Sequence, residues 1–296
     1  MANTQELLKR RKTIANTRKI TRTMELVASS KARKAQEAAD ASRPYAEALA
    51  KLVRDCAASE GAAEHPLLAS REVKRVVLLV ATSDRGLCGA FNANILRHAL
   101  ETIKAHEAQA AEVEIISLGK KGYSTLRYFG YEPAQGFGGI MDAPRYSQAL
   151  EVIEPLMERY LAGEIDRVEV VYPRFINVAR QEPSVAVLLP AGGGSQGGSL
   201  EMAAETLPAI GPEYFYSPSP VEMLEALIPQ TVRTALFSTL LQTSAGEHNA
   251  RRVAMKNATD AASDILKTIN RTYNRVRQGK ITQEIAEIVG AVEAMS

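Results

Sequence analysis

Residues 14–56 read IANTRKITRTMELVASSKARKAQEAADASRPYAEALAKLVRDC, and this stretch decides the fold. It holds no glycine and one proline, Pro44, while strong helix formers dominate. Small and apolar residues recur every seven positions, at Ile14, Thr21, Ala28, Ala35, Ser42, Leu49 and Cys56. A second row follows three residues later, at Thr17, Met24, Lys31, Ala38, Tyr45 and Leu52. Heptad spacing predicts a long helix with a coiled-coil seam, in which the proline can introduce a kink.

The C-terminal stretch, residues 220–292, repeats this pattern. Its helical composition is interrupted only by Pro229, Gly246, Gly279 and Gly290. One seven-residue row holds Met255, Ala262, Ile269 and Val276, and a second lies three residues on, at Ala258, Ile265 and Thr272. Because neither helix can bury its stripe alone, we expect the two ends of the chain to wrap around each other in antiparallel orientation.

Between the two helices the pattern changes to alternating strands and helices. Strands are predicted at 75–81, 113–118, 167–172 and 184–189, with helices at 93–106 and 146–161. This alternation predicts an α/β, Rossmann-like domain with a mostly parallel sheet, inserted between the helices of an antiparallel coiled coil. The expected boundaries are 1–60 for the N-terminal helix, 70–190 for the α/β domain, 191–218 for a flexible connection and 219–296 for the C-terminal helix.

Composition excludes several classes of protein. Of 296 residues, 46% are hydrophobic and 24% are charged, which is unlike a disordered chain. No run approaches the ~20 apolar residues that span a bilayer. The first residues, MANTQELLKRRK, lack the apolar segment of a secretory signal. Two cysteines, Cys56 and Cys88, provide no disulfide framework. We therefore expect a soluble protein of a reducing, cytoplasmic compartment.

Charge is distributed unevenly along the chain. Residues 1–34 carry ten Lys and Arg against two Glu, and residues 247–280 carry eight against three acidic residues. The region between them is acidic. Basic ends point to an acidic partner, which could be nucleic acid, a membrane surface or acidic protein loops. The alternative is that the basic helix faces are simply solvated.

No catalytic constellation stands out. Residues 83–92, SDRGLCGAFN, follow a strand and open a helix, where α/β folds bind phosphate, but they lack both glycine fingerprints. Cys88 is either a reactive thiol or a small buried residue. The four histidines show no metal-ligand spacing. These patterns predict no catalytic residue, cofactor or metal, and they fit a DNA-binding rod as well as a mechanical shaft.

Several separated motifs resemble one family, the gamma subunit of the rotary F-type ATP synthase. They are RKITRTMELVASS at 18–30 followed by KARK, SDRGLCGAFN at 83–92, PRFIN at 173–177, EHNARRVAMKNATD at 247–260 and YNRVRQGKITQEIAEIV at 273–289. The resemblance covers nearly the whole chain in family order. It implies a central stalk whose tip enters the ring of alpha and beta subunits and whose foot meets the c ring and the epsilon subunit. It also implies that ATP chemistry takes place on beta.

The resemblance carries over contact residues where the motifs match. Met24, Arg251, Gln278 and Thr282 match positions that touch beta. Tyr214 and Tyr216, in EYFYSPSP, match a segment near the c ring and epsilon. The implied location is the cytoplasmic face of a bacterial inner membrane, held there through the complex alone.

Three features depart from familiar members or leave alternatives open. Ser217 stands where a carboxylate is often found, and the glycine run at 192–198 has no counterpart. Cys56 and Cys88, far apart in sequence, do not supply the plant-type dithiol switch. A nucleic-acid-binding coiled coil and an α/β enzyme with helical arms are the rival interpretations, although the basic ends lack interleaved aromatics.

Overall fold

The computed structural model describes residues 4–57, 65–177, 181–191 and 219–295. Its contacts divide the chain into two compact units. Unit 1 combines Met1–Ala28 with Arg251–Ser296, and unit 2 is Ser29–Ala250. The two longest helices, α1 (Thr4–Ala57) and α6 (Pro220–Met295), each contribute one end to unit 1 and the other end to unit 2.

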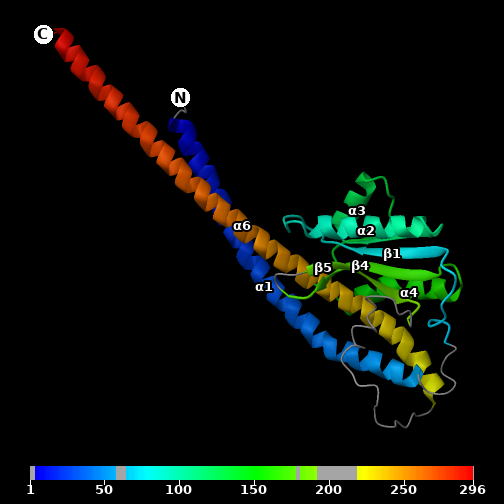
Figure 1. The fold of residues 1–296 in the computed structure, drawn as a ribbon. Helices are drawn as coiled ribbons and strands as arrows, with labels where there is room; N and C mark the ends of the chain where they lie inside the picture. Colours follow the sequence, from blue (N-terminus) through cyan, green and yellow to red (C-terminus); the bar gives the residue numbers. More distant parts are fainter. Residues whose placement is uncertain (1–3, 58–64, 178–180, 192–218, 296) are drawn as a thin grey trace. The chain divides into compact units, whose positions relative to one another are not determined.

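Unit 1 is an antiparallel pair of helical segments, which confirms the pairing of the two chain ends (Figure 1). The Thr259 hydroxyl donates to the Thr21 hydroxyl oxygen at 2.8 Å. Further along, the Arg11 guanidinium lies over the Tyr273 ring, 5.6 Å from its centroid. From Thr21 to Arg11 the position on α1 shifts towards the N-terminus, while the contacted position on α6 shifts from Thr259 to Tyr273, towards the C-terminus. The two segments therefore run in opposite directions.

The buried seam on the α6 segment of unit 1 differs from the predicted seam in its second row, which is displaced by one residue. The first row on α6 is confirmed, because Met255 and Ala262 are buried. The second row lies four residues after it, not three: Leu266 is 8% exposed, whereas Ile265 is 47% exposed. Positions three and four residues on lie on the same side of a helix, so heptad spacing alone does not separate them.

The same correction applies to the part of α1 in unit 2. Leu49 and Cys56 of the first row are buried, as predicted. The buried second row contains Ala32 and Val53, four residues after Ala28 and Leu49, while the predicted second-row residues are exposed at Ala38, Tyr45 and Leu52. The predicted three-residue offset is therefore wrong in both helices.

The rest of unit 2 is a five-stranded sheet in the order β3-β2-β1-β4-β5. The strands are β1 (Arg75–Ala81), β2 (Glu112–Leu118), β3 (Gln135–Phe137), β4 (Arg167–Phe175) and β5 (Gln181–Leu189). The first four are parallel, and β5 pairs antiparallel with β4. The mostly parallel sheet predicted from the β1 sequence is thus confirmed, with an antiparallel strand at one edge.

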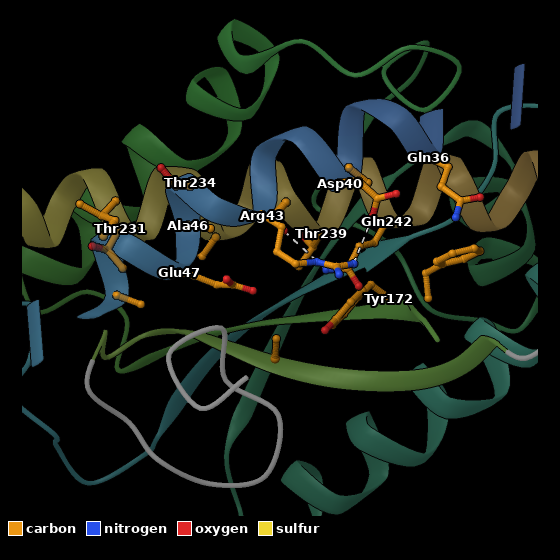
Figure 2. Close-up of a pocket in the computed structure, with 17 residues that line it drawn as sticks. Gln36, Asp40, Arg43, Ala46, Glu47, Tyr172, Thr231, Thr234, Thr239 and Gln242 are labelled. Atoms are coloured by element: carbon orange, nitrogen blue, oxygen red, sulfur yellow. Dashed lines mark hydrogen bonds and ion pairs between the residues drawn. The ribbon is translucent and has the colours of Figure 1, made fainter. Parts of the chain in front are cut away.

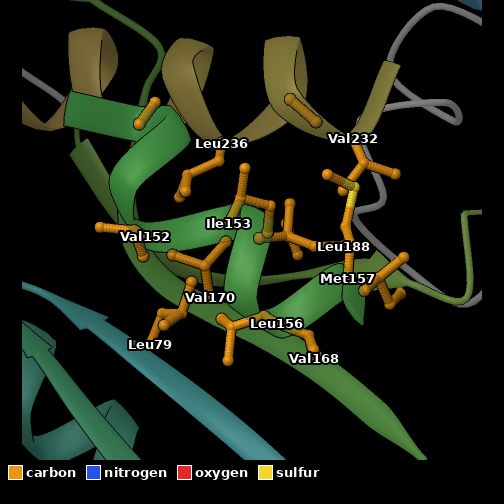
Figure 3. Close-up of a cluster of buried hydrophobic side chains, with 14 of the residues drawn as sticks. Leu79, Val152, Ile153, Leu156, Met157, Val168, Val170, Leu188, Val232 and Leu236 are labelled. Atoms are coloured by element: carbon orange, nitrogen blue, oxygen red, sulfur yellow. The ribbon is translucent and has the colours of Figure 1, made fainter. Parts of the chain in front are cut away.

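Helices cover both faces of this sheet (Figure 1). One face of β1, with Leu78 and Val80, packs against α2 (Phe91–Glu107) and Leu126 of α3 (Lys120–Tyr128). The opposite face carries Val77 and Leu79. It packs against α4 (Tyr146–Leu161) and the first turns of α6, with the core residues drawn in Figure 3. Burial on both faces explains why β1 reads as a continuous apolar run.

Two short elements, α3 and β3, were not predicted from the sequence. Gly119 precedes α3 with φ of 115°, and a side chain there would collide with the Thr82 backbone. Glycine therefore lets the end of β2 approach the end of β1 closely. Strand β3 has three residues and pairs with β2. Such a short strand carries too little periodicity to be found from sequence.

Ion pairs join the helical and α/β parts within unit 2. Lys31 Nζ on α1 lies 2.6 Å from Asp142 before α4, and Arg233 Nε on α6 lies 2.7 Å from Glu154 on α4. The buried His248 Nε2 lies 3.1 Å from the Asp142 carbonyl oxygen. The hydrogen bond from Lys31 lowers the pKa of the Asp142 carboxyl below its usual range. The segment before α4 is therefore tied to both long helices.

Candidate functional site

The loop after β1, which the sequence singled out as a candidate phosphate site, is closed by its own side chains. The Asn92 carboxamide oxygen accepts from the Ser83 backbone N–H at 3.0 Å. The Asp84 carboxylate accepts from the backbone N–H groups of Lys120, Gly139 and Met141, at 3.2, 2.8 and 3.2 Å. Because Lys120 is the first residue of α3, this carboxylate fills the place where a helix N-terminus would hold an anion.

Helix α6 crosses the same region of unit 2. A side chain built on Gly246 would lie 3.2 Å from the Gln181 side-chain oxygen and 3.4 Å from the Phe91 ring, so the helix backbone passes close to the start of β5 and of α2. In open α/β sheets, ligands bind outside the carboxyl ends of the strands. Here a helix of the chain itself packs there.

Cys88 lies within a hydrogen-bonded cluster and is 3% exposed. The Asn92 carboxamide donates to its sulfur at 3.3 Å, and the Ser83 hydroxyl lies 3.8 Å away. This environment supports the buried-residue interpretation over the reactive thiol. Both cysteines are buried, and neither forms a disulfide. Across the described residues, no group of three or more His, Cys, Asp or Glu side chains is arranged to hold a metal ion.

The four predicted beta-contact residues all belong to unit 1. Met24 is half-buried on α1, one turn from the Thr21–Thr259 contact. Arg251 is 8% exposed, so most of its side chain is already covered within this chain. Gln278 and Thr282 are exposed, and the Thr282 hydroxyl donates to the Gln278 carbonyl at 3.0 Å. The last two therefore share a solvent-facing side of α6, one turn apart.

An apolar stripe that was not predicted from the sequence extends that face of α6. Its members are all exposed, by 47 to 64%, and are Ile281, Ile285, Ile288, Val289 and Val292. On a helix this spacing places them within one side, continuous with Gln278 and Thr282. The opposite side carries Lys280, Gln283 and Glu287. The i, i+4, i+7 spacing was a signal that could have revealed the stripe.

Tyr214, Tyr216, Ser217 and the glycine run at 192–198 lie outside the described residues. Their predicted contacts therefore remain predictions. Among the helices that the structure describes, none combines the length and apolar character needed to cross a bilayer.

Comparison with known proteins decides the family. The chain matches the ATP synthase family profile over residues 3–295. The chain belongs to the ATP synthase gamma chain family. It is 41% identical over 296 residues to the ATP synthase gamma chain of Rhodopirellula baltica, covering 100% of this chain and 99% of that relative. It is 40% identical over 295 residues to the gamma chain of Pelotomaculum thermopropionicum, with both chains fully covered.

Solved structures share the fold at lower sequence identity. A chain from the Euglena gracilis mitochondrial ATP synthase gives a TM-score of 0.65 at 20% identity, covering 99% of this chain and 94% of its own length. A chain from the Tetrahymena thermophila mitochondrial ATP synthase, in a structure of the central stalk and c ring, gives 0.59 at 21% identity, with 81% and 99% covered. The gamma chain fold thus combines paired terminal helices and an α/β insertion, as predicted.

Proposed function

We propose that this chain is the non-catalytic central rotor shaft of a proton-translocating ATP synthase. In this role it couples rotation of the membrane c ring to conformational change at catalytic sites on the beta subunits. The observation that carries the proposal is the end-to-end match with gamma chains, because a shaft needs both terminal helices and the α/β insertion in one chain. The rival interpretation as a nucleic-acid-binding coiled coil has no support in these relatives.

The filled loop after β1 supports a non-catalytic role. Asp84 occupies the anion position at the start of α3, and its negative charge repels a phosphate. We infer that nucleotides, cofactors and metals act on the partner subunits and not on this chain. A shaft acts through contacts that stabilise one conformation of a partner subunit more than another, and these contacts shift the partner's population towards the stabilised conformation.

The apolar stripe on α6 supports insertion of the helix end into an apolar environment. Fully burying an Ile or Val side chain contributes about 1.5–3 kcal/mol. Since Ile285 and Val289 are 56% and 53% exposed, covering the rest of each should contribute about 1 kcal/mol. A sleeve formed by the alpha and beta subunits is the environment we propose.

Contacts with individual partners follow the motif matches and are part of the proposal. Met24, Arg251, Gln278 and Thr282 would meet beta, where neutral hydrogen bonds of the last two can form and break as the shaft turns. Tyr214 and Tyr216 would meet the c ring and epsilon. The shaft would then lie at the cytoplasmic face of the inner membrane, attached only through the complex.

Reconstitution tests the proposal directly. The full chain is combined with alpha and beta subunits, a bead is attached to the α/β domain, and ATP is added. We expect ATP-driven rotation of the bead. Removing two stripe residues with I285S and V289S should weaken assembly about 30-fold, the equivalent of about 2 kcal/mol.

A matched pair on the opposite side of the same helix, Q283S with E287S, serves as the control. Its side chains bond to each other at 2.9 Å and are exposed. Assembly of this variant should change little. Restored ATPase activity without rotation would refute the shaft, and equal losses in both double variants would refute the apolar insertion.

A further inference from the structure

The segment 139–142, between β3 and α4, bonds to both long helices through one residue, Asp142. The Asp142 carboxylate accepts from Lys31 Nζ on α1, at 2.6 Å to each oxygen. The Asp142 backbone carbonyl lies 3.1 Å from Nε2 of His248 on α6. Because a carbonyl oxygen can only accept, His248 donates this hydrogen bond. We call residues 139–142 the clamp segment.

The clamp segment is itself fixed to the α/β part of unit 2. The backbone N–H groups of Gly139 and Met141 donate to the Asp84 carboxylate, in the loop after β1, at 2.8 and 3.2 Å. The Met141 side chain is fully buried in the core that α4 and the sheet share. The segment is therefore held from one side by the α/β part, while Asp142 holds the helices on the other.

The two bonded helix positions lie next to the boundary of unit 2. On α1, Lys31 comes three residues after Ala28, the last residue of unit 1 on that helix. On α6, His248 comes three residues before Arg251, where unit 1 resumes. The clamp segment thus contacts each helix within one turn of the place where the helix leaves unit 2.

Deeper in unit 2, a cavity of about 100 Å³ lies between the same two helices and the sheet (Figure 2). Side chains from residues 36–50 of α1 and 231–242 of α6 line it, and many are polar, such as Gln36 and Gln242. Atoms that face a void lose packing contacts, so apolar packing holds the helices less firmly along this stretch. Polar contacts at the boundary of unit 2 therefore carry more of the attachment.

The two bonds to Asp142 favour a geometric role over a stabilising one. The side chains of Lys31 and Asp142 are both about one-third exposed, and such partly solvated ion pairs contribute little to stability. A charge-assisted hydrogen bond is nevertheless short and directional. The bond from His248 is buried, and losing its acceptor would leave a donor unsatisfied. Together they fix where each helix lies relative to the clamp segment.

We propose, on the basis of the rotor function proposed above, that Asp142 is a positioning residue that transmits torque between the α/β domain and both long helices. When the α/β domain turns, the clamp segment turns with it, because Asp84 and Met141 hold the segment. Asp142 then carries α1 through Lys31 and α6 through His248. Since one residue holds both helices, they turn together and do not slide past each other.

Spin labels on the full chain measure how firmly the clamp segment holds α1, without any partner subunit. Lys34 on α1 and Lys104 on α2 are exposed, so K34C and K104C can be labelled, whereas the native cysteines are buried. Double electron–electron resonance gives the distribution of distances between the two labels. This distribution should be narrow in the chain that keeps Asp142 and Lys31.

Three variants change the bond between Asp142 and Lys31. D142N keeps an acceptor but loses the charge, and charge-assisted hydrogen bonds are roughly twice as strong as neutral ones, so the distribution should widen about twofold. K31M removes the donor and should widen it at least as much. D142E keeps the carboxylate and should restore the narrow distribution, which a general loss of packing at this position would not do.

The ion pair between Arg233 on α6 and Glu154 on α4 provides the matched control. Its two atoms lie 2.7 Å apart, and its side chains are exposed to a similar degree as those of Lys31 and Asp142. E154Q removes this pair and leaves the clamp segment intact. Its free energy of unfolding in urea should fall about as much as that of D142N, while the label distances stay unchanged.

The same variants in the complex with alpha and beta subunits test the transmission of torque. A bead on the α/β domain reports angular fluctuations while the motor waits for ATP. D142N should raise the variance of the bead angle about twofold, for the same loss of bond strength. D142E and E154Q should leave the variance unchanged. ATPase activity without a bead should stay the same in all of them, because an unloaded shaft transmits little torque.

Unchanged label distances in D142N and K31M, or equal widening in E154Q, would overturn the clamp. Wider label distances with an unchanged bead variance would overturn its role in torque. Absence of ATP-driven rotation in the unsubstituted complex would refute the rotor function instead, and the label distances of the free chain would still show whether the clamp exists. If D142N fails to fold by circular dichroism, K31M decides, because it changes a partly exposed side chain.

Discussion

Replacing Leu266 by Ala should loosen the helix pair of unit 1, whereas replacing its neighbour Ile265 should not. Leu266 is 8% exposed and Ile265 is 47% exposed. Burying Leu removes nearly all its apolar surface from water, and truncation of buried leucines costs about 2–5 kcal/mol. In a two-helix seam the site can partly collapse, so we expect about 2 kcal/mol for L266A. The I265A variant loses about half of the free energy gained by burying an Ile side chain, because half of that side chain is already exposed. Alanine regains up to about 0.4 kcal/mol of helix propensity, so the net loss in the free energy of unfolding should stay under about 1 kcal/mol.

Amide hydrogen exchange of the full chain, followed over residues 4–28 and 251–276, measures the opening of this pair locally. A loss of about 2 kcal/mol corresponds to roughly 30-fold faster exchange in L266A, against less than about 5-fold in I265A. Exchange in unit 2 serves as the internal control. Equal acceleration in both variants, or a larger effect of I265A, would refute the four-residue offset of the seam and restore the three-residue one.

Three further predictions concern pairing, pH dependence and coupling. The Thr21 and Thr259 hydroxyls lie 2.8 Å apart, so T21C with T259C should form a disulfide within one molecule on mild oxidation; a non-reducing gel that shows only dimers would contradict antiparallel pairing. The lowered pKa of Asp142 means that its contribution to stability is present above the unfolded pKa of about 4 and is lost as pH falls through the lower folded pKa. Lys31→Met should therefore lower the free energy of unfolding at neutral pH, measured in urea, and reduce its fall as the pH becomes acidic. An unchanged dependence on pH would show that Lys31 does not cause the lowered pKa of Asp142. Met24→Lys adds a cation on the half-buried side of α1, and we expect proton pumping in reconstituted vesicles to fall more than ATPase activity. Equal losses would assign Met24 to assembly.

Local pattern was sufficient for the large elements. The heptad rows found both long helices because seven-residue spacing is a property of one helix and needs no partner. The apolar run of β1 predicted a strand buried on both faces, and the structure confirms it. The sequence also showed that residues 83–92 lack a phosphate-binding glycine motif, because such motifs are defined by the spacing of glycines within one short stretch.

Choices between nearly equivalent local patterns depended on the tertiary structure. Whether Ile265 or Leu266 faces the partner helix depends on how far α6 is rotated about its axis. Packing fixes this rotation, whereas the spacing in the sequence does not distinguish an offset of three residues from one of four. Asp84 reaches the backbone of Gly139 and Met141, more than fifty residues away, and no sequence pattern encodes such a contact.

The sequence by itself determined the helix–α/β–helix order, the heptad character of both ends and the family, because each rests on residues that are neighbours along the chain. The tertiary structure alone decided which row forms the seam, that the stripe from Ile281 to Val292 is exposed among the described residues, and that the side chains of Tyr45 and Gln230 touch. These are relations between distant segments, and their energies come from packing that exists only after the chain has folded.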